Sequence, residues 1–213
     1  MRPEIVTFWH GPLDRLRLTC LRSQVAAGHK VTVYSFEPLG RLPDGVGNAE
    51  AEAILPHSFA EKLRPTGADG AWRDWTILQF SDFFRMRLMA ENAGLWLDAD
   101  VLLLKPLEID PARAYFAWER PRQLGNSVLY LPSADPVVTA FQRLMAQQEL
   151  TPDWLALRHR LTFALRRWRG RSHRLSDIRV AIYGPAALTA LARRGGEKPI
   201  PGSLYAWAAE RFG

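Results

Sequence analysis

The chain has 213 residues and a net charge of +6, from 28 lysines and arginines against 22 aspartates and glutamates. Its length suits one compact domain, and a hydrophobic content of 47% excludes a disordered chain. No apolar run approaches the roughly 20 residues that a membrane-spanning helix requires, and the N-terminal apolar stretch is too short for a signal peptide. We therefore expect a soluble, cytoplasmic protein of one domain, residues 1–213.

The start of the chain predicts a strand, a helix and a second strand. Residues 5–8 form a short apolar run, and apolar side chains recur at near-helical spacing over residues 13–25. Gly28 can close that helix in the left-handed conformation, and residues 31–34 predict the next strand. The Gly- and Pro-rich residues 38–47 predict a loop. A strand, a helix and a strand in succession form the unit of a parallel sheet.

The same alternation continues along the chain. A helical pattern spans about 72–93, Gly94 ends it, and the apolar residues 95–97 predict a buried strand. We expect further strands at 115–118 and 127–131, and helices near 136–148, 153–168 and 185–193. The sequence therefore predicts an α/β fold with an open, mostly parallel sheet flanked by helices, in which ligands bind beyond the carboxyl ends of strands.

Asp98 and Asp100 directly follow the strand predicted at 95–97. Two carboxylates at the edge of a sheet can hold Mg²⁺ or Mn²⁺, and the metal can bridge a diphosphate. Mg²⁺ commonly takes only one or two protein carboxylates together with water and substrate phosphates, so this pair suffices for a metal site. A loop with two solvated aspartates is the alternative interpretation, because the Asp-x-Asp pattern is common.

The residues around this pair form a longer ordered pattern. Ser81-Asp82-Phe83-Phe84-Arg85 precedes Gly94-Leu95-Trp96-Leu97-Asp98-Ala99-Asp100, and Pro106 follows. This segment resembles the sugar-binding region of glycosyltransferase family 32, whose pattern is roughly S-D-x-x-R, a helix, G-G-x-Y-x-D-x-D and a downstream proline. Weaker similarity at residues 9–12, 28–29, 125–127 and 184–185 extends the resemblance over most of the chain.

The resemblance implies a GT-A type (Rossmann-like) fold and a metal-dependent hexosyltransferase of polysaccharide biosynthesis. A UDP-sugar or another nucleotide-diphosphate sugar would be the donor, and a glycan or lipid-linked molecule the acceptor. The anomeric configuration would be retained. Residues 1–106 would form the nucleotide-binding part and residues 107–213 the acceptor side.

The resemblance also implies roles for single residues. Asp100 would bind Mn²⁺ or Mg²⁺ directly, and Asp98 would contact metal-bound water or the ribose and sugar of the donor. Asp82 and Arg85 would orient the donor; their spacing also fits an ion pair on a helix surface, but their position ahead of Asp98 favours the functional role. Asn126 would face the transferred sugar or the acceptor, and we count it with Asp98 and Asp100 as catalytic.

Two further side chains follow the first strand. Trp9 would lie against the nucleotide, although tryptophan is also a common core residue. His10 could reach a phosphate, or hydrogen-bond to the backbone instead.

The sequence departs from the family pattern in three places. Ala93 replaces the first glycine of the usual pair, and Trp96 replaces the usual tyrosine. Many family members have a histidine metal ligand near the C-terminus, whereas no histidine follows residues 203–207 here.

Two rival functions remain open. The run from Asp98 to Val101 is similar to the opening motif of aspartate-nucleophile phosphatases, although Leu102 stands where Thr or Val is expected. A non-catalytic protein that binds sugar nucleotides or anionic glycans is the second rival, because of the missing histidine.

Seven arginines cluster between residues 158 and 174. They are Arg158, Arg160, Arg166, Arg167, Arg169, Arg171 and Arg174. They can form a solvated helical face, or attract anionic lipid headgroups at the inner membrane face or an anionic glycan. We expect no nucleic-acid partner, because only Phe163 and Trp168 interleave with the arginines.

Overall fold

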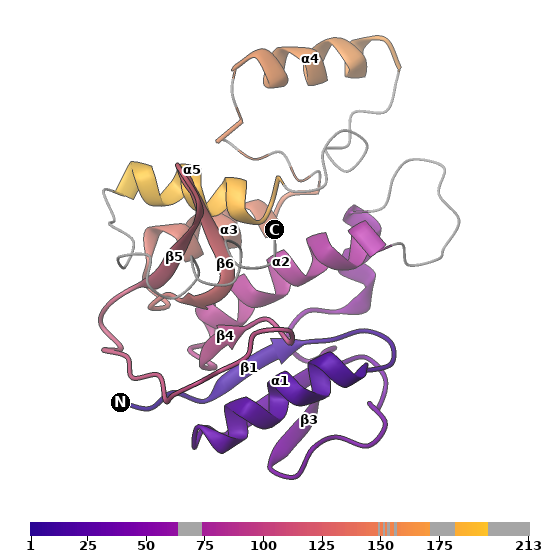
Figure 1. Cartoon of the computed structure of the whole chain (residues 1–213). Coiled ribbons are helices and arrows are strands. Elements are labelled where there is room, and N and C mark those ends of the chain that lie inside the picture. The colour runs from indigo at the N-terminus through magenta and orange to yellow at the C-terminus, as the bar shows by residue number, and fades with distance from the viewer. Residues whose placement is uncertain are drawn as a thin grey trace.

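The computed structural model describes residues 1–63, 74–148, 150, 152, 154–155, 157–170 and 182–195. Its elements follow in the order β1 (Ile5–Phe8), α1 (Arg15–Ala26), β2 (Val31–Ser35), β3 (Val46–Glu50), η1 (His57–Lys62), α2 (Asp74–Ala90), β4 (Leu95–Leu97), β5 (Tyr115–Arg120), β6 (Gln123–Tyr130), α3 (Pro136–Met145), α4 (Leu157–Trp168) and α5 (Pro185–Gly195). Figure 1 shows these elements coloured from indigo at the N-terminus to yellow at the C-terminus.

The six strands form one sheet in the order β3-β2-β1-β4-β6-β5. The strands β3, β2, β1 and β4 run parallel, with Ile5 of β1 opposite Val31 of β2 on one side and Leu95 of β4 on the other. β6 runs antiparallel to both β4 and β5. The predicted α/β fold with a mostly parallel sheet is therefore confirmed, and β1 and β4 lie side by side near its centre.

Helices cover both faces of the sheet (Figure 1). Alternate strand residues point to opposite faces, so Ile5 and Leu95 join the core under α1, while Val6 and Trp96 join the core under α2. The chain that follows β4 packs on the α1 side, and α3 and α5 pack on the α2 side. This layering leaves the carboxyl ends of β1 and β4 at the edge between α1 and α2.

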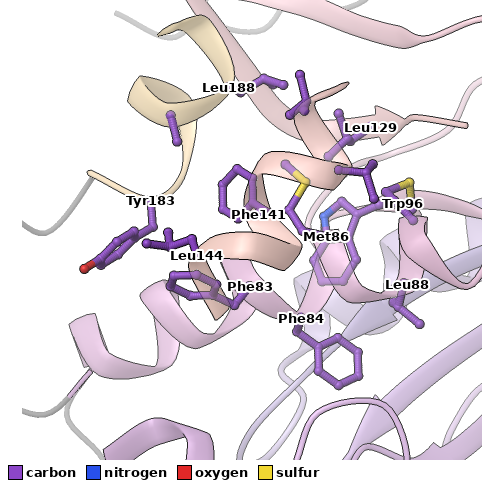
Figure 2. Close-up of a cluster of buried hydrophobic side chains, with 14 of the residues drawn as sticks. Phe83, Phe84, Met86, Leu88, Trp96, Leu129, Phe141, Leu144, Tyr183 and Leu188 are labelled. Atoms are coloured by element: carbon purple, nitrogen blue, oxygen red, sulfur yellow. The ribbon is translucent and has the colours of Figure 1, made fainter. Parts of the chain in front are cut away.

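The larger core lies between α2, α3 and the sheet (Figure 2). The Phe83 ring of α2 lies 5.8 Å from Phe141 of α3 and 4.8 Å from Tyr183, measured between ring centroids. All three side chains are at most 2% exposed, and full burial of one such side chain stabilises the fold by about 1.5–3 kcal/mol. Helix α2 is thereby fixed against the sheet at the level of the strand ends.

Two helices end in the same hydrogen-bonded motif. Gly28 closes α1 in the left-handed conformation, as predicted, with φ of 83°. The prediction that the second helix continues to residue 93 is wrong, because Asn92 adopts φ of 51° and α2 ends at Ala90. The Ala93 amide then donates to Leu88 O at 3.0 Å and the Asn92 amide to Met89 O at 3.1 Å, which satisfies the last helical carbonyls.

Several predicted boundaries also differ. The loop predicted at 38–47 ends at Val46, where β3 begins. β3 is an edge strand, and its sequence has no apolar alternation that would predict it. β5 and β6 are longer than predicted and meet in a tight turn at Arg122, whose φ is 67°. Helix α3 ends at Met145 instead of 148, and the described part of α4 begins at Leu157 instead of 153. None of the helices in the described ranges combines the length and apolar character needed to cross a membrane.

Candidate active site

A cavity of about 510 Å³ opens at the carboxyl ends of β1 and β4, between the first turn of α1 and residues 77–85 of α2. The residues that line it are Thr7, Phe8, Trp9 and His10 after β1, Arg17 of α1, Ile77, Leu78, Ser81 and Arg85 of α2, and Trp96, Asp98, Ala99 and Asp100 at β4. Five of the site residues proposed from the sequence, namely Trp9, His10, Arg85, Asp98 and Asp100, therefore share one cavity.

Arg85 lies at the centre of the polar groups on the cavity wall. It is only 5% exposed, and its guanidinium donates to the Ser81 carbonyl at 3.2 Å, the Ser81 hydroxyl at 3.1 Å and the Asn126 carbonyl at 2.5 Å. It also stacks over the Trp96 ring, 4.5 Å from the centroid. Arg85 Nη1 lies 3.3 Å from Asp98 Oδ1. These contacts hold one positive charge in a fixed orientation at the cavity.

Asp82 and Asn126 lie behind Arg85 and do not line the cavity. Asn126 Nδ2 donates to Asp82 Oδ1 at 2.8 Å, and Arg85 Nη2 lies 3.7 Å from the same oxygen. A Cβ at Gly184 would lie 2.6 Å from Asp82 Oδ2, so the glycine leaves room for this carboxylate. Asp82 is thus a partner of Arg85 and Asn126. That Asp82 or Asn126 contacts a substrate directly stays a prediction.

Burial governs the ionisation of Asp82. Desolvation raises the pKa of its carboxyl from 3.8 to about 6, although Arg85 and the hydrogen bond from Asn126 favour the charged form. The negative charge of Asp98 adds a smaller increase of the pKa. Asp82 is therefore not the exposed helix-surface ion-pair partner that its spacing from Arg85 alone permits.

The two aspartates after β4 are held differently. Asp98 Oδ1 accepts a hydrogen bond from Trp96 Nε1 at 2.6 Å, and the Asp98 amide donates to Ser127 O at 2.8 Å. Within the described residues, Asp98 Oδ2 has no hydrogen-bond or ion-pair partner. The Asp100 side chain is 52% exposed, and its Oδ2 lies 3.8 Å from Arg17 Nη2. The pair therefore presents one free oxygen of Asp98 and one open carboxylate.

The oxygens of Asp98 and Asp100 fit a hard divalent cation that takes most of its ligands from water and a bound phosphate. Among the described residues, no group of three or more His, Cys, Asp and Glu side chains could hold a metal ion. Mn²⁺ or Mg²⁺ can instead complete its coordination with water and phosphate oxygens, which Asp98 and Asp100 leave room for. Residues 203–207, after which the resemblance stated from the sequence would place a histidine ligand, lie outside the described residues.

The hydroxyl of Thr7 is buried in the cavity wall. Thr7 is 1% exposed and lines the cavity, yet its Oγ1 makes no hydrogen bond within the part of the chain that the structure describes. A buried polar group left unpaired costs about 1–3 kcal/mol. Thr7 Oγ1 is itself buried, so a ligand or water could pair it only after a local rearrangement of the cavity wall.

A second cavity of about 360 Å³ adjoins the first through Trp9 and His10. Gly11, Pro12 and residues 35–40 form the rest of its wall. Trp9 thus lines both cavities, and the Arg17 guanidinium lies over the Trp9 ring, 5.2 Å from the centroid.

Sequence reasoning missed Arg17 and the segment 35–40. The signal for Arg17 was present, because Asp14 caps α1 and holds Arg17 in the first turn, next to the end of β1. No comparable pattern marks residues 35–40, which reach the site only because β2 pairs with β1.

Comparison with known proteins supports the fold. No protein-family model matches the sequence, and no curated protein sequence matches it. A solved structure named PaToxG Glycosyltransferase superposes with a TM-score of 0.52, covering 90% of this chain and 71% of that chain at 13% sequence identity. This chain shares its fold with a glycosyltransferase. The predicted α/β fold with a mostly parallel sheet flanked by helices is thus confirmed, while the GT-A type and the resemblance to family 32 stay predictions.

Proposed function

We propose that this chain is a metal-dependent hexosyltransferase that moves a sugar from a UDP-sugar to a glycan or lipid-linked acceptor with retention of configuration. The observation that carries the proposal is the convergence of Asp98, Asp100 and Arg85 on one cavity at the carboxyl edge of the sheet. The shared fold with a glycosyltransferase supports the same reaction class.

The charges at the cavity suit a diphosphate leaving group. A divalent metal held by Asp98 and Asp100 would offset the negative charge that develops as the sugar bond breaks. Arg85 adds a second positive charge whose position is set before the reaction by Ser81 and Trp96. Preorganised charges of this kind need no rearrangement when the bond breaks, which is why they lower the barrier.

The remaining cavity residues suit the other parts of the donor. Trp9 offers a ring face for a nucleobase, and His10 lies where it can hydrogen-bond to phosphate or ribose. Asp82 and Asn126 act on the donor through Arg85, which both of them contact.

Thermal unfolding with nucleoside diphosphates and UDP-sugars, each with and without Mn²⁺, tests donor binding. A ligand that binds the folded state raises the unfolding temperature, so we expect the largest increase from a uridine nucleotide together with Mn²⁺. Mn²⁺ alone should have little effect, because the chain supplies few ligands.

Replacement of Asp100 by Asn tests the metal site. We expect sugar release from UDP-sugars to fall by about 100-fold or more, because the variant loses a direct metal ligand, while the unfolding temperature without ligand stays unchanged. Asp44→Asn is the matched control, because Asp44 is an exposed aspartate outside the cavity. Undiminished turnover in Asp100→Asn would overturn the metal assignment.

Two other outcomes would favour the rival functions. Binding of UDP and Mn²⁺ without turnover of any donor would indicate a non-catalytic sugar-nucleotide protein. An acid-labile phosphate on Asp98 would indicate a phosphatase. Where transfer occurs, the anomeric proton of the product in an NMR spectrum reports retention or inversion.

A further inference from the structure

Helix α4 has a composition unlike that of the other helices. Residues 157–170 contain five arginines and neither Asp nor Glu. The five are Arg158, Arg160, Arg166, Arg167 and Arg169. Figure 1 shows α4 apart from the sheet and from the helices that cover it. Its strong positive charge is therefore presented away from the body of the protein.

Four large apolar side chains of this segment are exposed. Leu157 is 69% exposed, Leu161 62%, Leu165 46% and Trp168 81%. At about 100° per residue these four positions fall within a sector of about 80° on the helix, so they form one continuous apolar stripe. A helix that packs on a core buries such a stripe, whereas here the stripe faces outward.

The arginines border this stripe on both sides. The same helical spacing places Arg158 along one edge of it, and Arg160 and Arg167 along the other. Arg169 directly follows the helix, and its amide still donates to Leu165 O at 3.1 Å, which keeps it on the same edge as Arg158. Long arginine side chains can lay their methylene groups along an apolar surface while the guanidinium reaches a polar layer. An apolar stripe between two rows of arginines is typical of helices that lie in the interface of a membrane.

We propose that α4 docks this chain on an anionic lipid bilayer. The stripe of Leu157, Leu161, Leu165 and Trp168 would enter the boundary between headgroups and acyl chains, and the flanking arginines would contact lipid phosphates. The absence of acidic residues from 157–170 selects an anionic surface over a zwitterionic one. The proposal does not depend on glycosyl transfer, because α4 supplies no residue to the cavity.

Co-sedimentation with vesicles tests the proposal. We expect the protein to bind phosphatidylcholine vesicles that contain phosphatidylglycerol, and to bind pure phosphatidylcholine vesicles much more weakly. Leu161→Asp should weaken binding to the anionic vesicles by about tenfold or more, because the stripe loses a leucine and gains a charge. Leu104→Asp is the matched control, since Leu104 is 87% exposed and lies outside α4.

A second pair of variants tests the charge. Each basic residue near an anionic bilayer contributes about a fivefold increase in binding, so Arg158→Glu with Arg169→Glu should weaken binding by about 25-fold or more. Arg22→Glu with Arg41→Glu makes the same change of net charge at exposed arginines outside α4 and should have a smaller effect. Because all these positions are exposed, circular dichroism and the unfolding temperature should match the wild type.

Three results would overturn the proposal. The first is wild-type protein that does not bind anionic vesicles. The second is Leu161→Asp or the Arg158 and Arg169 double variant binding as well as its control. The third is a wild-type dimer, seen by light scattering, that Leu161→Asp dissociates while vesicle binding is absent, which would assign the stripe to a second copy of the chain.

Discussion

At the scale of single residues, Asp82 combines burial with charge. Its pKa is raised to about 6 in the folded protein from 3.8, so the folded state holds a proton more tightly than the unfolded state does. For an acid this direction means that ionisation destabilises the fold. The penalty, about 3 kcal/mol, is fully present above the folded pKa and disappears as the pH falls through 6 towards 3.8.

Asp82→Asn should therefore change how stability depends on pH. Between about pH 7 and pH 4.5, in the absence of divalent metal, the free energy of unfolding of the wild type should rise by about 2 kcal/mol relative to that of the variant. The side-chain carbonyl of the variant can still accept the hydrogen bond from Asn126, so the geometry is kept. Urea unfolding at the two pH values measures the difference, and equal pH dependence of the two proteins would contradict it.

The sequence predicts the types of these residues better than their contacts. Helical spacing is enough to place Asp82 and Arg85 on one face of α2, and the apolar run at β4 is enough to place Asp98 and Asp100 at a strand end. The sequence does not show that Asn126 lies against Asp82, because this contact joins positions 44 residues apart, on β6 and on α2. Nor does it show that the Trp96 indole donates to Asp98.

At the scale of elements, Gly94 is the residue that lets β4 join β1. Its φ is 147°, and a Cβ there would overlap the carbonyl oxygen of Glu4, to which the Leu95 amide donates at 2.8 Å. Gly94→Ala must therefore push the start of β4 away from β1. We expect the free energy of unfolding to fall by about 3 kcal/mol or more.

Denaturant unfolding of Gly94→Ala beside Gly40→Ala measures this effect. Gly40 has no heavy atom within 4 Å of its Cβ position, so that control should stay within about 0.5 kcal/mol of the wild type. If Gly94→Ala kept its free energy of unfolding as well as Gly40→Ala does, the close approach of β4 to Glu4 would not limit stability.

Elements with strong periodicity were the ones predicted. The central strands at 5–8 and 95–97 and the first helix follow from apolar spacing, because each of them buries a continuous run or stripe. β3 was missed because it lies at the edge of the sheet with its side chains mostly half-buried or exposed. The β5–β6 turn was missed because Pro121-Arg122 is not one of the usual two-residue turn sequences.

At the scale of the whole molecule, His29 joins distant parts of the chain. It is 4% exposed, donates from Nδ1 to Pro3 O at 2.9 Å and accepts at Nε2 from the Leu107 amide at 3.0 Å. The end of α1 is thereby tied both to the chain before β1 and to the segment that follows Asp100.

His29→Ala should lower the free energy of unfolding by about 2 kcal/mol, because it leaves a buried carbonyl and a partly buried amide without their partner. Lys105→Ala, an exposed change on the same segment, is the control and should have little effect. Thermal and urea unfolding of the two variants compare them, and similar stability would show that the tie contributes little.

The contacts of Asp98 bear on how a divalent metal would reach the site in the proposed reaction. One oxygen of that carboxylate is committed to Trp96 and Arg85, so the protein can give a divalent ion only part of its coordination shell. In the proposed reaction the diphosphate and water would complete the shell, so the metal would act as a co-substrate that arrives and departs with the nucleotide. Turnover would then follow the concentration of the metal–donor complex, and a chelator would stop it reversibly while the fold stayed intact.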